Sequence, residues 1–110
     1  MSELLIVWIL FAHWVADFVC QSDWMAKEKS KNMDALYLHI LTYALVMSAM
    51  TMNVVFGCAN ALIHLFIDYF TSRWSSKLWA KGRFHDFFVV IGFDQFIHVA
   101  CLLTTWKLLA

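Results

Sequence analysis

Residues 54–71 read VVFGCANALIHLFIDYFT, an apolar run of 18 residues that is interrupted by one histidine and one aspartate. A run of about 20 apolar residues is what an α-helix needs to cross the ~30 Å hydrocarbon core of a bilayer. Similar runs occupy residues 4–20, 35–52 and 87–106. Because isolated strands cannot cross lipid and four segments cannot close a barrel, we expect four membrane-spanning helices.

The composition of the whole chain indicates the same class of protein. Hydrophobic residues make up 63% of the 110 residues and charged residues 15%, against about 45–50% and 25% in soluble domains. A soluble domain of this length buries only about 60% of its unfolded surface, so the apolar excess must face lipid. We therefore predict an all-α polytopic membrane protein, in which residues 1–110 form a single domain, a bundle of four transmembrane helices with short loops.

Charge gives the expected orientation and excludes one class of partner. The formal net charge is zero, so no basic field exists to hold a nucleic acid, and we expect no such partner. The basic residues follow the first and third spans, and the positive-inside rule places these two loops in the cytoplasm and both termini outside. These residues are Lys27, Lys29 and Lys31 in one loop, and Arg73, Lys77, Lys81 and Arg83 in the other.

Polar residues interrupt every span at steps of about four, which places them on one stripe of each helix. At 1.5 Å per residue they all lie within roughly 5–18 Å of the predicted cytoplasmic boundary. No lysine or arginine is expected at that depth, so the carboxylates require protons, the histidines or a bound cation to neutralise them. The residues of this cluster are His13, Asp17, His39, His64, Asp68, Asp94 and His98.

Imidazoles and carboxylates in this number indicate a metal site. Zinc, manganese and iron all accept such ligands, and we expect zinc first, with the other two as alternatives. Seven ligands exceed one tetrahedral ion and suit two ions, or one ion whose ligands are oriented by other side chains. A hydrogen-bonded polar core without metal is the alternative. The expected supporting residues are Gln21, Tyr43, Asn60 and Gln95.

The order of these residues resembles a family of small bacterial and phage membrane proteins catalogued as domain of unknown function 3307. The resemblance covers essentially the whole chain. It implies a multi-pass protein of the bacterial inner membrane, with the outside termini in the periplasm, and it implies no activity. The sequence departs from the family pattern at residues 69–72, where we would expect a basic residue before Arg73. The matching residues are His13, Asp17-Phe18, Gln21, Met25-Ala26, Lys27, His39, His64, Asp68, Asp94-Gln95 and His98.

Three classes of function fit these features. The first is a metal-dependent hydrolase of a membrane lipid or lipid phosphate, in which the metal activates water and Asp17 is the general base. The second is a non-enzymatic structural or regulatory protein that binds a membrane-protein partner or another copy of itself. The third, an ion or proton transporter subunit, is weakened by the nearly featureless outer halves of the spans. In the first class, the phosphate would meet Lys27, Lys29, Arg73 and Lys77.

A reporter enzyme fused after residue 110 tests the predicted orientation. Because seven of the eight basic residues lie on one side of the predicted spans, we expect a fused periplasmic reporter to be active and a fused cytoplasmic reporter to be inactive. The opposite pattern would invert the topology and move the His/Asp cluster to the outer half of the membrane.

Overall fold

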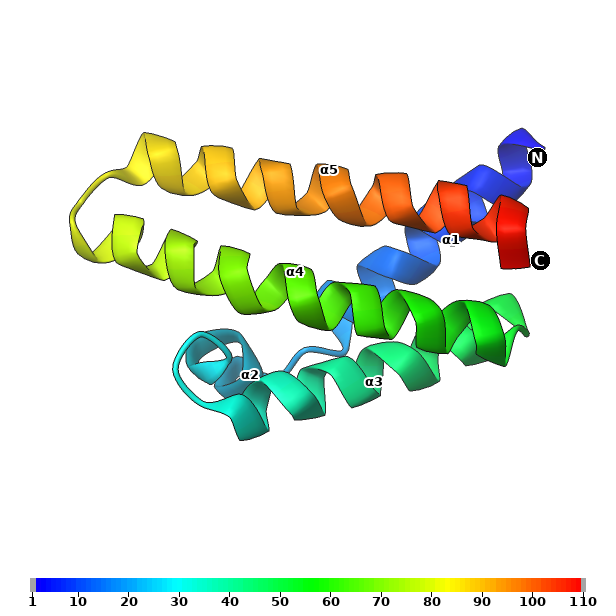
Figure 1. Cartoon of the computed structure of the whole chain (residues 1–110), viewed down its shortest axis with the longest axis horizontal. Helices are drawn as coiled ribbons and strands as arrows, with labels where there is room; N and C mark the ends of the chain where they lie inside the picture. Colours follow the sequence, from blue (N-terminus) through cyan, green and yellow to red (C-terminus); the bar gives the residue numbers. More distant parts are fainter. Residues whose placement is uncertain (1, 110) are drawn as a thin grey trace.

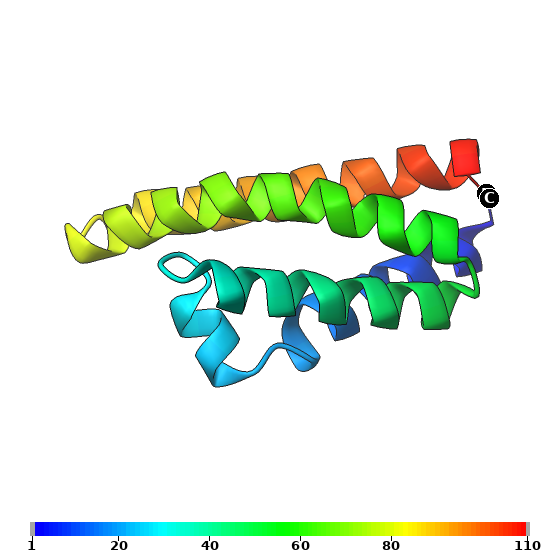
Figure 2. The ribbon, with the colours of Figure 1, turned by 60° about the horizontal axis from the view of Figure 1, so that its bottom comes forward.

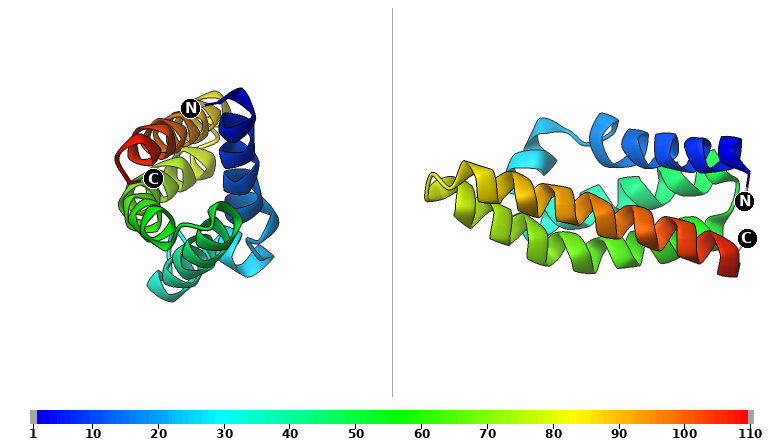
Figure 3. Two further views of the ribbon diagram at one scale, coloured as in Figure 1. Left: turned by 90° about the vertical axis from the view of Figure 1, so that its right-hand side faces the viewer. Right: turned by 90° about the horizontal axis from the view of Figure 1, so that it is seen from above.

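The computed structural model describes residues 2–109, and within this range it contains helices and no strands, which confirms the predicted all-α class (Figure 1). Its dimensions are 42 × 27 × 20 Å. Figure 3 shows the long helices running along the long axis, with the start of the first helix and the end of the last at the same end of the molecule. The elements are α1 (Glu3–Trp14), the π-helical turn η1 (Val15–Val19), α2 (Asp23–Glu28), α3 (Met33–Thr51), α4 (Val54–Ala80) and α5 (Phe84–Leu109).

Three helices, α3, α4 and α5, are long and apolar enough to cross a membrane, and they indicate a membrane protein. The prediction of four spans is confirmed for these three only. The first apolar segment forms the 12-residue α1, about 18 Å long, and then changes to the five-residue π turn η1. Hydropathy is continuous over residues 4–20, and it carries no information about this change in backbone hydrogen bonding.

The two predicted cytoplasmic loops are largely helical. The third span was expected to end near residue 71, but α4 continues to Ala80, so Arg73 and Lys77 lie on this helix. The true connection to α5 is short and contains Gly82, whose φ of 71° suits a glycine. The loop after the first span contains α2, which begins after the capping residue Ser22 and lies beside the start of α3, away from the chain termini (Figure 2).

The interior of the bundle contains one layer of polar side chains, and the outer surface of the bundle is apolar. The core at the terminal end of the bundle is apolar, and Ile9, Met47, Phe56 and Leu102 are fully buried there. Large apolar side chains such as Phe66 also point outward along the helices. Because a soluble protein rarely exposes so much continuous apolar surface, this arrangement fits contact with lipid.

The antiparallel pair of α3 and α4 depends on one glycine. The turn between them places Met52 in the left-handed region, with a φ of 52°, and Asn53 then caps α4 by accepting from the Phe56 amide at 3.0 Å. One turn further, a Cβ atom on Gly57 would lie 2.7 Å from the Ser48 nitrogen and 2.8 Å from its Cα. Only a residue without a side chain therefore permits this close approach of the two backbones.

We expect Gly57→Ala to destabilise the protein by about 1–3 kcal/mol, because the added methyl group must push α3 away from α4. Gly92→Ala is the matched control: this glycine lies within α5, and its added Cβ would meet nothing within 4 Å. Gly92→Ala should leave the free energy of unfolding unchanged or raise it by up to about 1 kcal/mol, because alanine has the higher helix propensity. Thermal unfolding in detergent measures both, and equal melting temperatures for the two variants would contradict the packing argument.

Candidate metal centre

The seven residues of the predicted cluster lie together in the centre of the bundle. Each is buried, with at most 6% of its surface exposed. They come from five elements. His13 and Asp17 come from the adjacent α1 and η1, His39 from α3, a His–Asp pair from α4 and an Asp–His pair from α5. Because the polar stripes lie at equal depth, their side chains form a single cluster when the helices pack.

Four of these residues have the geometry of a metal-binding cage. One ligand atom each from Asp17, His39, His64 and Asp68 lies within 4.8 Å of all the others. The two histidine Nε2 atoms are 3.1 Å apart. Asp17 Oδ1 lies 3.0 and 3.3 Å from them, and Asp68 Oδ2 lies 3.4 and 3.1 Å from them. A tetrahedron with metal–ligand bonds of about 2.0–2.1 Å has edges of about 3.3 Å, so these spacings fit an ion of zinc size.

A second group shares one aspartate with the first. Asp68, Asp94 and His98 also bring three potential ligand atoms within 4.8 Å of one another. His98 Nε2 lies 3.5 Å from Asp68 Oδ1 and 3.3 Å from Asp94 Oδ1, yet this buried nitrogen has no hydrogen-bond partner among the described residues. Asp68 therefore presents one oxygen to each group, as a carboxylate that bridges two positions would.

Side-chain hydrogen bonds hold the carboxylates of the cluster in place. Gln95 Nε2 donates to Asp17 Oδ2 at 3.2 Å and to Asp94 Oδ2 at 3.0 Å. Thr71 donates to Asp94 Oδ1 at 2.5 Å. Tyr43 contacts His13 Nδ1 through its hydroxyl at 2.8 Å. Two expected supporting residues, Tyr43 and Gln95, thus contact the cluster, and Thr71 is a further one that the sequence analysis did not select.

Lys29 provides a charge that the sequence analysis did not place in the cluster. Its Nζ donates to Asp68 Oδ2 at 3.2 Å, although the residue belongs to the segment after α2. Burial alone would lower the pKa of this ammonium, but the carboxylates of Asp68, Asp17 and Asp94 hold the pKa above its usual value. The expectation that no basic residue reaches this depth was wrong, because a lysine stem can carry its charge several ångströms from the backbone.

The π turn η1 places Asp17 in the cluster. The Cys20 amide donates to the Val15 carbonyl at 2.9 Å, five residues back, as in a π-helix. Such a turn widens the helix and rotates the side chains that follow, and π turns are frequent at functional sites. Asp17 Oδ2 lies 3.6 Å from His13 Nε2, and Asp17 Oδ1 lies 3.0 Å from His39 Nε2. The His-x-x-x-Asp spacing gave no sign of this turn.

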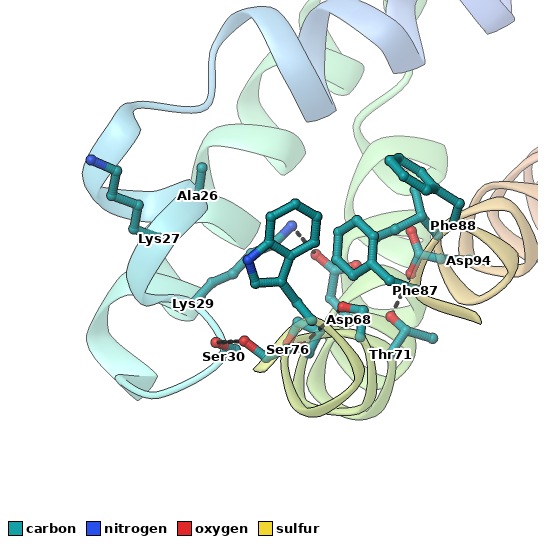
Figure 4. Close-up of a pocket in the computed structure, with 14 residues that line it drawn as sticks. Ala26, Lys27, Lys29, Ser30, Asp68, Thr71, Ser76, Phe87, Phe88 and Asp94 are labelled. Carbon is teal, nitrogen blue, oxygen red and sulfur yellow. Dashed lines mark hydrogen bonds and ion pairs between the residues drawn. The ribbon is translucent and has the colours of Figure 1, made fainter. Parts of the chain in front are cut away.

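A pocket opens onto the second group from the end of the bundle away from the termini. It has a volume of about 580 Å³ and lies between α2, α4 and α5. Asp68 and Asp94 lie in its wall, and Lys29 crosses it to reach Asp68 (Figure 4). The other lining residues combine hydroxyl groups with aromatic rings and small apolar groups. They are Ala26, Lys27, Ser30, Thr71, Ser72, Ser75, Ser76, Trp79, Phe87, Phe88 and Ile91.

The remaining predicted residues lie apart from the cluster or at the pocket rim. Asn60 bonds to Thr105 at 2.8 Å nearer the terminal end, where it joins α4 to α5. The Gln21 side-chain oxygen is buried without a partner among the described residues. Lys27 lines the pocket, but its ammonium points away from the centre (Figure 4). Arg73 contacts the Tyr69 ring and carbonyl, and neither it nor Lys77 lines the pocket.

Fold and site together define a class: a small helical membrane protein whose interior holds a histidine–aspartate cluster that could bind a metal ion. The chain belongs to the family described as "Protein of unknown function (DUF3307)", whose model matches residues 5–110. The resemblance in the sequence is thereby confirmed over essentially the whole chain. No curated protein and no solved structure matches the chain.

We expect the purified protein to bind a divalent metal ion and His64→Ala to abolish most of this binding, because His64 lies in the four-residue cage. The affinity should fall at least as much as the roughly 10–100-fold that is typical when a supporting residue is lost. Elemental analysis and chelator competition measure the change. His85→Ala is the control, since His85 is exposed at the start of α5 and outside the cluster. Equal metal occupancy in both variants would contradict the metal site and favour a hydrogen-bonded core without metal.

Proposed function

We propose that this protein is a metal-dependent hydrolase within a bacterial inner membrane, and that it acts on the phosphate group of a lipid. The observation that carries the proposal is the position of Asp68, which is shared between two groups of ligands. The first group offers four protein ligands, the number that closes a tetrahedral zinc site. The second offers three ligands and borders the pocket, so a position would stay open for water or substrate, as in catalytic sites.

The charge of the cluster supports a divalent ion, with zinc first and manganese or iron as alternatives. Three buried aspartates face one ammonium, that of Lys29, whose side chain is 20% exposed. With the histidines neutral, one divalent ion would balance two of the three negative charges. A second ion in the open group would add positive charge, which an anionic substrate could balance. A bound metal would polarise a phosphoryl oxygen and activate water.

The pocket supports a lipid phosphate as the substrate. The lining residues include hydroxyl groups and Lys29, which can donate hydrogen bonds to phosphate oxygens. They also include Trp79, Phe87 and Phe88, which offer apolar contact to a lipid chain. Hydrolysis would join a water oxygen to phosphorus and break the ester P–O bond, and the alcohol would leave with a proton.

We assign Asp17 to the metal rather than to the attacking water. Its Oδ1 faces the two cage histidines, and its Oδ2 accepts from Gln95. Asp17 is not among the residues of the pocket, whereas Asp94 is. A general base must lie within hydrogen-bond reach of the proton that it takes. Asp94 is therefore the carboxylate that would act on the attacking water, either by taking its proton or by holding the ion that activates it. The general-base role predicted for Asp17 becomes the alternative that the experiment below decides.

The proposed topology has four membrane crossings. α1 and η1 together would form the first crossing, 17 residues in length. The basic residues around α2 and at the α4–α5 connection would face the cytoplasm, and both termini the periplasm. The pocket would then lie near the cytoplasmic surface of the membrane, within reach of lipid headgroups.

A structural or regulatory role is the second candidate, and the closed four-ligand cage favours it. In that case the ion would only stabilise the bundle, whose apolar outer surface would bind a membrane-protein partner or a second copy. Transport has less support. Beyond the cluster, towards the termini, the interior contains the fully buried apolar residues Ile9, Met47, Phe56 and Leu102, which would obstruct a polar path.

We expect Asp94→Asn to lower hydrolysis of a lipid phosphate by about 10²–10⁴-fold while about one metal ion per chain stays bound in the four-residue cage. Asp17→Asn should instead lose the ion as well, because it removes a cage ligand. Phosphate release from lipid phosphates in detergent micelles and elemental analysis give the two measurements. An Asp17→Asn protein that keeps its metal and loses activity would make Asp17 the base. An inactive wild type with a bound ion would favour the structural role.

A further inference from the structure

Lys29 and the four-residue cage use the same oxygen atom. Lys29 Nζ lies 3.2 Å from Asp68 Oδ2. That oxygen also lies 3.1 Å from His64 Nε2 and 3.4 Å from His39 Nε2. The ammonium therefore approaches the cage at one of the atoms that would bond to a metal ion.

An ammonium and a divalent cation at one carboxylate oxygen repel each other. The repulsion is strong here because Asp68 is buried, and charges at buried sites are screened less than charges in bulk water. In the absence of metal, the same lysine stabilises the cluster, since three buried carboxylates need a counter-charge. One site thus has two competing sources of positive charge.

The pocket offers Lys29 a second position. Its side chain is 20% exposed and lines the pocket, and a lysine stem has four rotatable bonds through which the ammonium can move. Ser72 lies in the same pocket, and its buried hydroxyl has no hydrogen-bond partner among the described residues. The neighbouring Ser30 bonds to Ser76 of α4 at 3.1 Å, and this contact ties the segment after α2 to α4 without using the lysine side chain.

We propose that Lys29 is the internal counter-ion of the metal-free cluster, that metal binding displaces it into the pocket, and that it there binds the anionic group of the substrate together with Ser72. This inference rests on the proposed metal site. It means that the metal both completes the site and frees the side chain that recognises a phosphate. Binding of metal and binding of phosphate would then favour each other.

Chemical labelling of lysines tests the displacement without any substitution. The wild-type protein is treated with an amine-acylating reagent, with zinc or with a chelator, and the label on each lysine is quantified by mass spectrometry. We expect zinc to increase the label on Lys29 several-fold, because the ammonium leaves the carboxylate. Lys27 and Lys31 are exposed residues of the same segment, and their labelling should not change.

Lys29→Met tests the competition and the recognition of phosphate separately. Without the ammonium, zinc should bind about tenfold more tightly in chelator competition, a coupling of ordinary size. A short-chain lipid phosphonate, which cannot be hydrolysed at the P–C bond, should bind the zinc-loaded variant about tenfold more weakly. Lys31→Met is the matched control and should leave both affinities unchanged, because Lys31 is exposed and does not line the pocket.

The outcomes separate this inference from the proposed function. If the wild type binds no metal, both are overturned. If zinc binds but labelling of Lys29 stays constant, or if Lys29→Met binds zinc more weakly, the lysine is a fixed partner of Asp68 and the inference fails while the metal site stands. If Lys29→Met does not fold, the labelling experiment alone decides.

Discussion

Three carboxylates buried in an apolar bundle need positive charge close to them, and the rest of the structure is organised around this requirement. Isolated ionised groups are costly in lipid and in protein interiors. Here four imidazoles surround the aspartates, Lys29 reaches them from outside the spans, and Gln95 and Thr71 bind their remaining oxygens. Two clusters of ligand atoms around Asp68 leave places where a cation would complete the neutralisation.

The fold meets this requirement by combining tight helix packing with one irregular turn. Gly57 lets α3 and α4 approach closely, and this contact contributes to bringing His39 beside His64. The π turn η1 rotates Asp17 towards both of them. Tyr43 lies over the His64 ring, with centroids 4.4 Å apart, and it also contacts His13. Each of these features narrows the positions that the ligand atoms can take, which is how a protein preorganises a site.

The sequence predicted the cluster better than it predicted its surroundings. Polar residues at helical spacing and equal depth, such as His64 with Asp68, can be identified from the sequence alone, because periodicity indicates which face of a helix they occupy. The shortness of α1, the π turn and the helical extension of α4 to Ala80 depend on backbone hydrogen bonds that hydropathy does not record. The contact between Lys29 and Asp68 depends on the path of the chain after α2. Gln95 was expected as a supporting residue, but nothing in the sequence indicated that it bonds to both Asp17 and Asp94.

The cluster draws on both ends of the chain, and this has a consequence for biosynthesis. Asp17 lies in the first sixth of the sequence, whereas Asp94 and His98 lie on the last helix. During translation, the α3–α4 hairpin can assemble early. The second ligand group, which Asp68 forms with Asp94 and His98, and the pocket are complete only when α5 has left the ribosome and joined its neighbours. Lys29 and the four-residue cage are made before α5, so the lysine or a cation in the cage could neutralise the early carboxylates. Assembly of the second group and of the pocket would therefore be the last step of maturation.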